Sequence, residues 1–301
     1  MAQLSGRVIA AFGRHLLVRT AAGELLRARP FGRALSIVCG DQVRCRIDAR
    51  HEEVHVTEVL PRVSALHRTS LRGVSEPVVA NLTQLLVVLA PRPAPDLFVV
   101  DRYLAAATAA GIAATLIVNK SELPVEDSLR AELAAYAQAG YAPLATSAVT
   151  GAGLEQLRAA IGAGTLAALV GQSGVGKSSL VRCLLPEAAD VAVGELVRDA
   201  DGRHTTSAAR LFALPAGGEL IDSPGVRDFA PATAALDARS LGFSEVRALA
   251  PQCRFADCRH LREPECAVRA AAESGALWPR RYESYRRLRR LYTQLQSERP
   301  R

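Results

Sequence analysis

Residues 171–178, GQSGVGKS, fit the pattern G-x-x-x-x-G-K-[ST] at every position. An apolar run precedes them and an amphipathic run follows, which predicts a strand, a loop whose backbone N–H groups surround a phosphate, and a helix. We expect Lys177 to bridge β- and γ-phosphates, Ser178 to bind Mg²⁺ and Ser179 to reach the α-phosphate. The predicted loop comprises Gly171, Gln172, Ser173, Gly174, Val175, Gly176, Lys177, Ser178 and Ser179.

Two later motifs could complete the phosphate side of such a site. The motif DSPG begins at Asp222, which would hold Mg²⁺ through water, and ends at Gly225, whose N–H would sense the γ-phosphate. Residues 201–206, DGRHTT, lie between this motif and the phosphate loop, where a first switch segment is expected. A threonine there can close over Mg²⁺ and the γ-phosphate, and we favour Thr206 over Thr205; a threonine in an ordinary turn is the alternative.

A base-reading loop is indicated by NKSE, residues 119–122. In an N-K-x-D loop the asparagine contacts N7 and O6 of guanine, the lysine stem lies along the base, and the carboxylate accepts from N1–H and the 2-amino group. Adenine lacks that donor pair, so it would leave the carboxylate unpaired. Here the carboxylate is Glu122, one methylene longer than the usual aspartate. The predicted contacts are Asn119, Lys120, Ser121 and Glu122.

The base-side motifs precede the phosphate-side motifs, the reverse of the usual order in guanine-nucleotide switches. TSA, residues 146–148, follows the next apolar run, and Ser147 and Ala148 are expected to place amides behind guanine O6. Each motif stands at the end of an expected strand, which indicates a circular permutation. Lysine usage agrees, because the chain has 37 basic residues and its only lysines are Lys120 and Lys177.

A different chemistry is expected near the C-terminus, where three cysteines and a histidine follow the spacing C-x4-C-x-H-x5-C. Four soft ligands within 14 residues predict a closed, structural, tetrahedral zinc site. A reducing cytoplasm would disfavour disulfides between them. The predicted ligands are Cys253, Cys258, His260 and Cys266.

Residues 278–296 are predicted to form a helix rich in arginine. It could pack on the zinc module through a stripe containing Tyr285, Leu288 and Tyr292 and leave a solvated basic face. Alternatively its arginines contact RNA phosphates. The candidates for such contacts are Arg280, Arg281, Arg286, Arg287, Arg289 and Arg290.

The elements around these motifs predict a multidomain protein. Residues 1–62 contain five expected short strands, 6–12, 15–20, 24–30, 42–48 and 54–60, which fit an OB-like β-barrel or an SH3-like barrel. We predict a linker over 63–80, and a permuted α/β P-loop domain over 81–232, where apolar strands alternate with amphipathic helices. Residues 233–301 are predicted to form a mostly helical zinc-binding domain.

Charge is distributed unevenly over the 301 residues, whose net charge is +7. Residues 1–62, 63–232 and 233–301 carry +4, −3 and +6. Basic ends suggest contact with a polyanion, and solvated basic faces are the alternative. No apolar run approaches the roughly 18 residues needed to cross a bilayer, and the N-terminus is a poor signal peptide. We therefore expect a cytoplasmic, monomeric protein with no membrane partner.

Together these motifs closely resemble the RsgA (YjeQ) family of circularly permuted ribosome-assembly GTPases. The resemblance extends from the barrel through LIVNKSEL, TSAVTGAGL, GQSGVGKSSL, GRHTTSAARL and GGELIDSPGVRDF to CRFADCRHLREPEC. It implies GTP hydrolysis to GDP and phosphate with Mg²⁺, one structural Zn²⁺, and action on the small (30S) ribosomal subunit and its rRNA late in assembly, and it favours RNA contact by the basic tail. Glu122 departs from the family's aspartate.

The water that attacks GTP needs an orienting group. Ras-like switches use a glutamine after the D-x-x-G glycine, but Val226 stands there. His204 is the closest candidate, and a surface histidine without a catalytic role is the alternative. The rival to a subunit-stimulated GTPase is an RNA-binding assembly module that uses GTP only as an ordering ligand.

Overall fold

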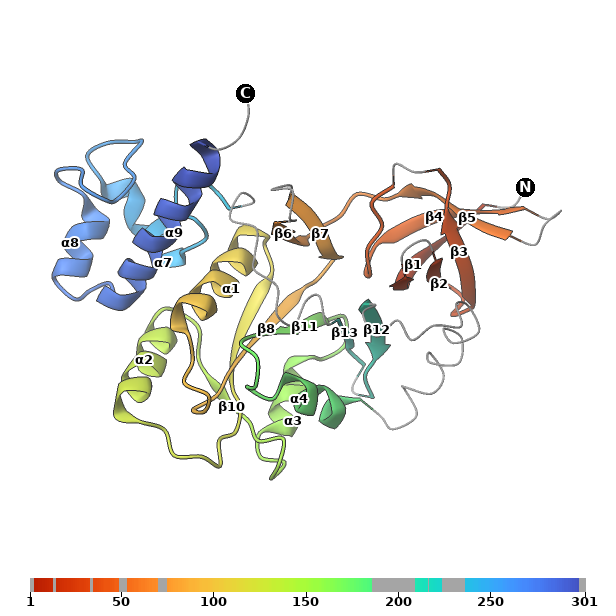
Figure 1. Cartoon of the computed structure of the whole chain (residues 1–301), viewed down its shortest axis with the longest axis horizontal. Helices are drawn as coiled ribbons and strands as arrows, with labels where there is room; N and C mark the ends of the chain where they lie inside the picture. The colour runs from red at the N-terminus through yellow and green to blue at the C-terminus, as the bar shows by residue number, and fades with distance from the viewer. Residues whose placement is uncertain are drawn as a thin grey trace.

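The computed structural model describes residues 3–12, 15–32, 35–48, 53–69, 75–185, 209–215, 217–223 and 236–297. A β-barrel at the N-terminal end, a central α/β layer and a C-terminal group of helices follow one another in Figure 1. Among the described residues, no helix is both long enough and apolar enough to span a bilayer.

The N-terminal barrel is closed. Its strands are β1 (Gln3–Phe12), β2 (His15–Thr20), β3 (Leu25–Pro30), β4 (Gln42–Asp48) and β5 (Glu53–Val59). They pair in the order β1-β2-β3-β5-β4, and a further β1–β4 pairing completes the circle. Alternate residues, such as Val8, Val18 and Val56, fill the interior. The five predicted strands are confirmed, and the closed five-stranded order is that of an OB-like barrel.

The segment predicted as a linker contains an antiparallel pair of strands. These are β6 (Ala65–Thr69) and β7 (Ser75–Ala80). The pair is tied to the barrel, because Ala80 N donates to Cys39 O over 3.0 Å and the Asn81 amide donates to Gly40 O over 2.9 Å. Residues 63–69 and 75–80 therefore form a junction, built on a strand pair, between the barrel and the central domain.

The central domain has a six-stranded sheet in the order β10-β9-β8-β11-β13-β12. The strands are β8 (Gln84–Leu89), β9 (Ala113–Val118), β10 (Leu144–Ala145), β11 (Leu166–Val170), β12 (Ala209–Ala213) and β13 (Glu219–Asp222). All pair in parallel except β12, which is antiparallel to β13. The carboxyl ends of β8, β9, β11 and β13 therefore meet at one edge, which is where ligand loops collect in such sheets.

Helices cover both faces of this sheet. They are α1 (Leu97–Ala109), α2 (Asp127–Gln138), α3 (Leu154–Ala160) and α4 (Lys177–Leu184). Leu85 and Val87 of β8 pack with α1 and α2, whereas Leu86 and Val88 pack with α3 and α4. Because both faces are buried, the strands read as continuous apolar runs.

The barrel and the central sheet are hydrogen-bonded to each other. β1 pairs antiparallel with β12, with Ala10 opposite Arg210 and Ala11 opposite Ala209, so the two form one continuous eleven-stranded sheet. Arg7 and Arg19 of the barrel both form ion pairs with Glu219 at the start of β13. The barrel therefore contacts the two strands nearest the predicted metal loop.

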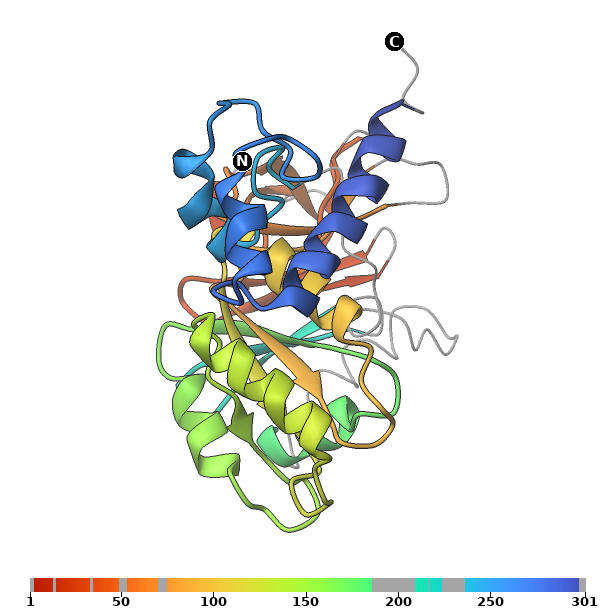
Figure 2. The same cartoon turned by 90° about the vertical axis from the view of Figure 1, so that its left-hand side faces the viewer.

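The C-terminal domain is helical. It consists of α7 (Ser244–Leu249), the 3₁₀ turn η2 (Ala250–Gln252), α8 (Ala267–Glu273) and α9 (Pro279–Ser297). Phe243, Val246, Val268 and Tyr285 lie in its own apolar cluster, which also includes Ala105 of α1. Figure 2 shows α9 running beside α1, which brings this domain against the central one.

Candidate functional site

The phosphate loop folds as predicted, between the end of β11 at Val170 and the start of α4 at Lys177. Gly171 has a φ of 145°, and a Cβ at this position would lie 2.1 Å from Val88 O, so only glycine fits against β8. The Lys177 ammonium donates to Gly171 O and Gln172 O over 2.7 and 2.8 Å. This lysine is 6% exposed and lies within the loop that it is expected to serve.

The base-reading loop is bonded directly to the phosphate loop. The Asn119 side-chain amide is buried and donates to Val175 O over 2.9 Å, while its oxygen accepts from the Thr146 hydroxyl over 3.3 Å. A Cβ on Gly176 would lie 2.3 Å from Asn119 Nδ2. The missing side chain at residue 176 is what lets the amide approach, across 56 positions of sequence.

Lys120 makes the second link between these loops. Its φ is 61°, and its ammonium donates to Gly174 O over 2.7 Å and to Arg92 O over 2.9 Å. The aliphatic stem therefore spans the space between NKSE and the phosphate loop. An arginine would present a broad planar fork instead of a compact ammonium, which is a physical reason for lysine here in a chain that otherwise uses arginine.

The two base-side loops are also joined to each other. Ser121 N donates to Thr146 O over 3.0 Å. A hydrogen bond from Ser147, together with the glutamate's own backbone N–H, lowers the pKa of Glu122 below its ordinary value. The exposed carboxylate is therefore ionised at neutral pH and able to accept from a donor. The longer Glu122 side chain thus reaches the loop that contains Ser147 and Ala148.

Asp222 lies on the same edge of the sheet as the phosphate loop. It ends β13, whose neighbour in the sheet is β11, with Ile221 opposite Ala168. Ser178 lies in the first turn of α4, above that edge. The structure thus brings together the predicted phosphate-loop, base-loop and Asp222 residues. His204, Thr205, Thr206, Gly225 and Val226 lie outside the described residues.

The predicted metal ligands come together as a compact group. Cys253 Sγ and Cys266 Sγ lie 3.4 and 3.5 Å from His260 Nδ1 and 3.9 Å from each other. All four ligand atoms, Cys258 Sγ included, are within 4.8 Å of one another. Tetrahedral zinc, with bonds of about 2.3 Å to sulfur and 2.0–2.1 Å to nitrogen, requires ligand–ligand edges of roughly 3.6–3.8 Å. The donor set and its spacing therefore fit zinc.

Helix α9 supports the backbone of this group. Tyr282 and Tyr285 donate their hydroxyls to His260 O and Arg259 O over 2.8 and 3.0 Å. Cys266 is also the N-cap of α8, because its sulfur accepts from Arg269 N. The cluster thus fixes the loop between α7 and α8 against the last helix of the chain.

Comparison with known proteins agrees with this arrangement. A family model described as RsgA GTPase matches residues 59–231. The chain belongs to the RsgA GTPase family. It is therefore a GTPase, a hydrolase that acts on GTP. The order of its motifs, with the base loop before the phosphate loop along the chain, agrees with this family.

Relatives of the RsgA family match nearly the whole chain. The "Small ribosomal subunit biogenesis GTPase RsgA" of Pseudomonas aeruginosa is 43% identical over 288 residues, covering 94% of this chain and 84% of the relative. The protein of the same description from Azotobacter vinelandii is 44% identical over 292 residues, with the same coverage.

Two solved structures also match the chain over nearly its whole length. YjeQ from Thermotoga maritima has a TM-score of 0.73 and 27% identity, covering 99% of this chain and all of that one. YloQ, described as a circularly permuted GTPase, has a TM-score of 0.71 at 24% identity, covering 100% and 97%, and supports the fold. The permuted RsgA architecture predicted from the sequence is therefore confirmed.

Three of the six arginines predicted to contact RNA form hydrogen bonds within the chain. Arg281 is 2% exposed and donates to Asp101 and Glu245, and Arg280 donates to Asp101 and Glu132. Arg289 is 4% exposed and donates to backbone carbonyls and a tyrosine hydroxyl. Because these three guanidiniums donate to acceptors within the chain, the proposal of RNA contact below rests on the other three arginines.

The other three arginines remain on the outside of α9. Arg286 pairs with Glu283 over 3.0 Å at the surface, and Arg287 stacks 4.0 Å from the centre of the Phe98 ring. Arg290 is exposed. This part of the helix presents positive charge at its surface.

Two contributors to the nucleotide site, Thr146 and Asp96, were missed from the sequence. Thr146 orients the Asn119 amide, and the Gln172 side chain accepts from the backbone N–H of Asp96 over 3.0 Å. Asp96 in turn caps α1 through Phe98 N. Asp96 has the signature of an N-cap, since it precedes an apolar helical run, but its contact with the phosphate loop is tertiary and carries no local pattern.

We predict that Gly176→Ala weakens GDP binding about tenfold or more, because the new Cβ would displace the Asn119 amide and leave buried polar groups unpaired. Gly164→Ala is the matched control: its φ is 81°, also left-handed, but nothing lies within 4 Å of the added Cβ. Calorimetric titration should find the control within about twofold of wild type. Equal losses in the two variants would mean that backbone strain, rather than contact with Asn119, causes the effect.

Proposed function

We propose that this GTPase binds the small ribosomal subunit and assists its late maturation, and that the subunit stimulates its hydrolysis of GTP. The observation that carries the nucleotide part is the hydrogen-bonded junction of Asn119 and Lys120 with residues 174–176. The subunit is proposed because the relatives are named as small ribosomal subunit biogenesis GTPases. The protein is proposed to work as a cytoplasmic monomer.

GTP is the proposed substrate. Guanine would be read by Asn119 and the Glu122 carboxylate, with the amides of 147–148 behind it. The phosphates would lie on the backbone N–H groups of the phosphate loop, where α4 contributes the positive end of its dipole. Lys177 would exchange its two loop carbonyls for the β- and γ-phosphates.

Magnesium would be held by Ser178 directly and by Asp222 through water, and the ion would offset negative charge on the transferred phosphoryl group. Thr206 and Gly225 are proposed to close over the γ-phosphate, and His204 to orient the attacking water. Val226 cannot orient water, because it has no polar atom. These assignments rest on the motifs and on the position of Asp222 beside the phosphate loop.

Zinc is the proposed metal of the Cys/His cluster, held by Cys253, Cys258, Cys266 and Nδ1 of His260. Its role would be structural, because four protein ligands complete a tetrahedron. The loop between α7 and α8 has little regular structure of its own, so the metal would contribute much of its folding free energy.

We predict that Cys258→Ser lowers zinc content and loosens residues from about 250 onward while GDP affinity stays within about twofold of wild type. Hydrogen exchange should show lost protection in α8 and around α9, and preserved protection in β8 and β11. Cys183→Ser, a cysteine outside the cluster, is the control. Metal analysis that finds stoichiometric zinc in the Cys258 variant, or none in wild type, would contradict the assignment.

The surface proposed to contact rRNA contains Arg286, Arg287 and Arg290 of α9, and the basic barrel is proposed as a second contact. Each phosphate neutralised by an arginine releases counterions, so affinity should fall steeply with added salt. The alternative is an RNA-binding assembly module for which GTP is only an ordering ligand. Subunit-dependent phosphate release separates the two.

We predict that small subunits raise phosphate release well above the intrinsic rate and that large subunits do not.

Changing Arg286, Arg287 and Arg290 to Gln should weaken small-subunit binding at least fivefold and flatten its salt dependence, with intrinsic hydrolysis within about twofold of wild type. The control is Arg130, Arg158 and Arg254 to Gln, three arginines in surface ion pairs elsewhere. Turnover that is negligible with and without subunits would favour the alternative.

A further inference from the structure

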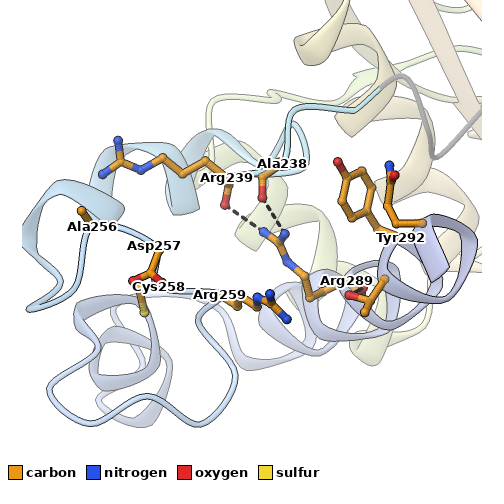
Figure 3. Close-up of a pocket in the computed structure, with 10 residues that line it drawn as sticks. Ala238, Arg239, Ala256, Asp257, Cys258, Arg259, Arg289 and Tyr292 are labelled. Atoms are coloured by element: carbon orange, nitrogen blue, oxygen red, sulfur yellow. Dashed lines mark hydrogen bonds between the residues drawn. The ribbon is translucent and has the colours of Figure 1, made fainter. Parts of the chain in front are cut away.

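A pocket of about 430 Å³ opens beside the Cys/His cluster (Figure 3). Its walls come from three separate segments: residues 238–239, the cluster loop at 256–259, and the last turns of α9. The volume lies within the range of small-ligand sites. None of the nucleotide residues described above lines it.

Arg289 forms the floor of this pocket and donates to neutral acceptors. Its guanidinium donates to Ala238 O over 2.5 Å, Arg239 O over 2.9 Å and the Tyr285 hydroxyl over 2.6 Å. No carboxylate among the described residues forms an ion pair with it. The contrast is Arg281 on the same helix, which is equally buried but faces Asp101 and Glu245. Three arginines and one acidic residue are among the ten residues that line the pocket, and this balance favours an anion.

Two more arginines line the pocket, Arg239 and Arg259. Both are exposed, and neither guanidinium forms an ion pair with a described residue. The bonds from Arg289 hold the backbone of residue 239, and Tyr285 holds the backbone of residue 259. The Arg239 and Arg259 side chains therefore extend from backbone positions that are held by hydrogen bonds. Asp257 is the one acidic residue of the ten that line the pocket.

The Tyr292 ring forms the side of the pocket opposite Arg239. Tyr292 is half-buried, and its ring centre lies 5.9 Å from the guanidinium carbon of Arg289. In Figure 3 the Tyr292 ring and the Arg239 side chain lie on opposite sides of the Arg289 guanidinium. Thr293 and Gln296 add polar groups on the same side of α9. The pocket thus combines a flat apolar surface with cations a short distance away.

We propose that this pocket binds single-stranded RNA, with a base stacked on Tyr292 and the adjoining phosphates on Arg259 and Arg239. The inference deepens the proposed function and rests on it, since it specifies how the C-terminal domain would hold rRNA. Stacking on aromatic rings needs a base that is splayed out of a helix, and a basic groove supplies the affinity for the backbone. A base stacked within a duplex would not reach the ring.

The test uses the full-length, zinc-loaded protein and a fluorescent ten-nucleotide uridine RNA. Tyr292→Leu should weaken binding about tenfold and leave the salt dependence unchanged, whereas Tyr292→Phe should bind like wild type. Arg239→Gln with Arg259→Gln should lower the slope of log K against log salt by about 1.4, or about 0.7 for each lost phosphate contact. Arg254→Gln with Arg269→Gln removes the same charge outside the pocket and should not change the slope.

Zinc content, thermal unfolding and intrinsic GTP hydrolysis should be unchanged in all of these variants. If Tyr292→Leu and the Arg239/Arg259 pair both bind the RNA like wild type, the pocket proposal is overturned, even if small-subunit binding by wild type upholds the proposed function. Weaker binding of a ten-base-pair duplex than of the single strand to wild type supports the proposal. Failure of wild type to bind small subunits would overturn the proposed function separately, whatever the short RNA does.

Discussion

The hydrogen bond from the Asn119 amide to Val175 O is the contact on which the nucleotide site depends. It lies in a buried environment, where losing a partner leaves a polar group unsatisfied. Gly176 makes the bond possible by having no side chain, and Lys120 adds a second bond to residue 174. The loop expected to read the base and the loop expected to hold the phosphates therefore behave as one unit.

This unit explains why a permuted chain can build an ordinary site. In the sheet, β8 lies between β9 and β11, and all three run in parallel, so their final residues meet at one edge whatever their order along the chain. Permutation changes which loops connect the strands and leaves that edge intact. It also places the chain's two ends, the barrel and the helical domain, outside the nucleotide unit.

Both ends are nevertheless tied closely to the central domain. The barrel shares a β-ladder with β12 and two ion pairs with Glu219 of β13. The helical domain is joined through Asp101 of α1, which is buried and accepts from Arg280, Arg281 and Tyr136. Removing one member of such a network typically costs about 3–5 kcal/mol, because it leaves a buried charge unpaired. Helix α1 also contacts Gln172 through Asp96, which connects the helical domain to the phosphate loop.

Local patterns in the sequence predicted the phosphate loop, the Cys/His spacing and the five barrel strands, because each is determined by neighbouring residues. Contacts between residues far apart in the sequence could not be predicted from such local patterns. A basic helix looks the same whether its arginines face water or, like Arg281, a carboxylate 180 positions away. Likewise, residues 65–69 and 75–80 form strands by pairing with each other and by contacts with residues 39–40, in a segment whose alternation is too weak to indicate strands.

Titrations of Asn119→Ala with GDP and with pyrophosphate, which has no base, separate a role in reading guanine from a role in holding the phosphate loop. Pyrophosphate cannot bond to the Asn119 amide through a base, so its affinity reports on the phosphate loop. Because Asn119 is expected to do both, GDP affinity should fall steeply, and the weaker pyrophosphate affinity should fall as well, about fivefold or more. A variant whose GDP affinity falls while its pyrophosphate affinity is unchanged would show that Asn119 reads the base without supporting the phosphate loop, and would contradict this dual role.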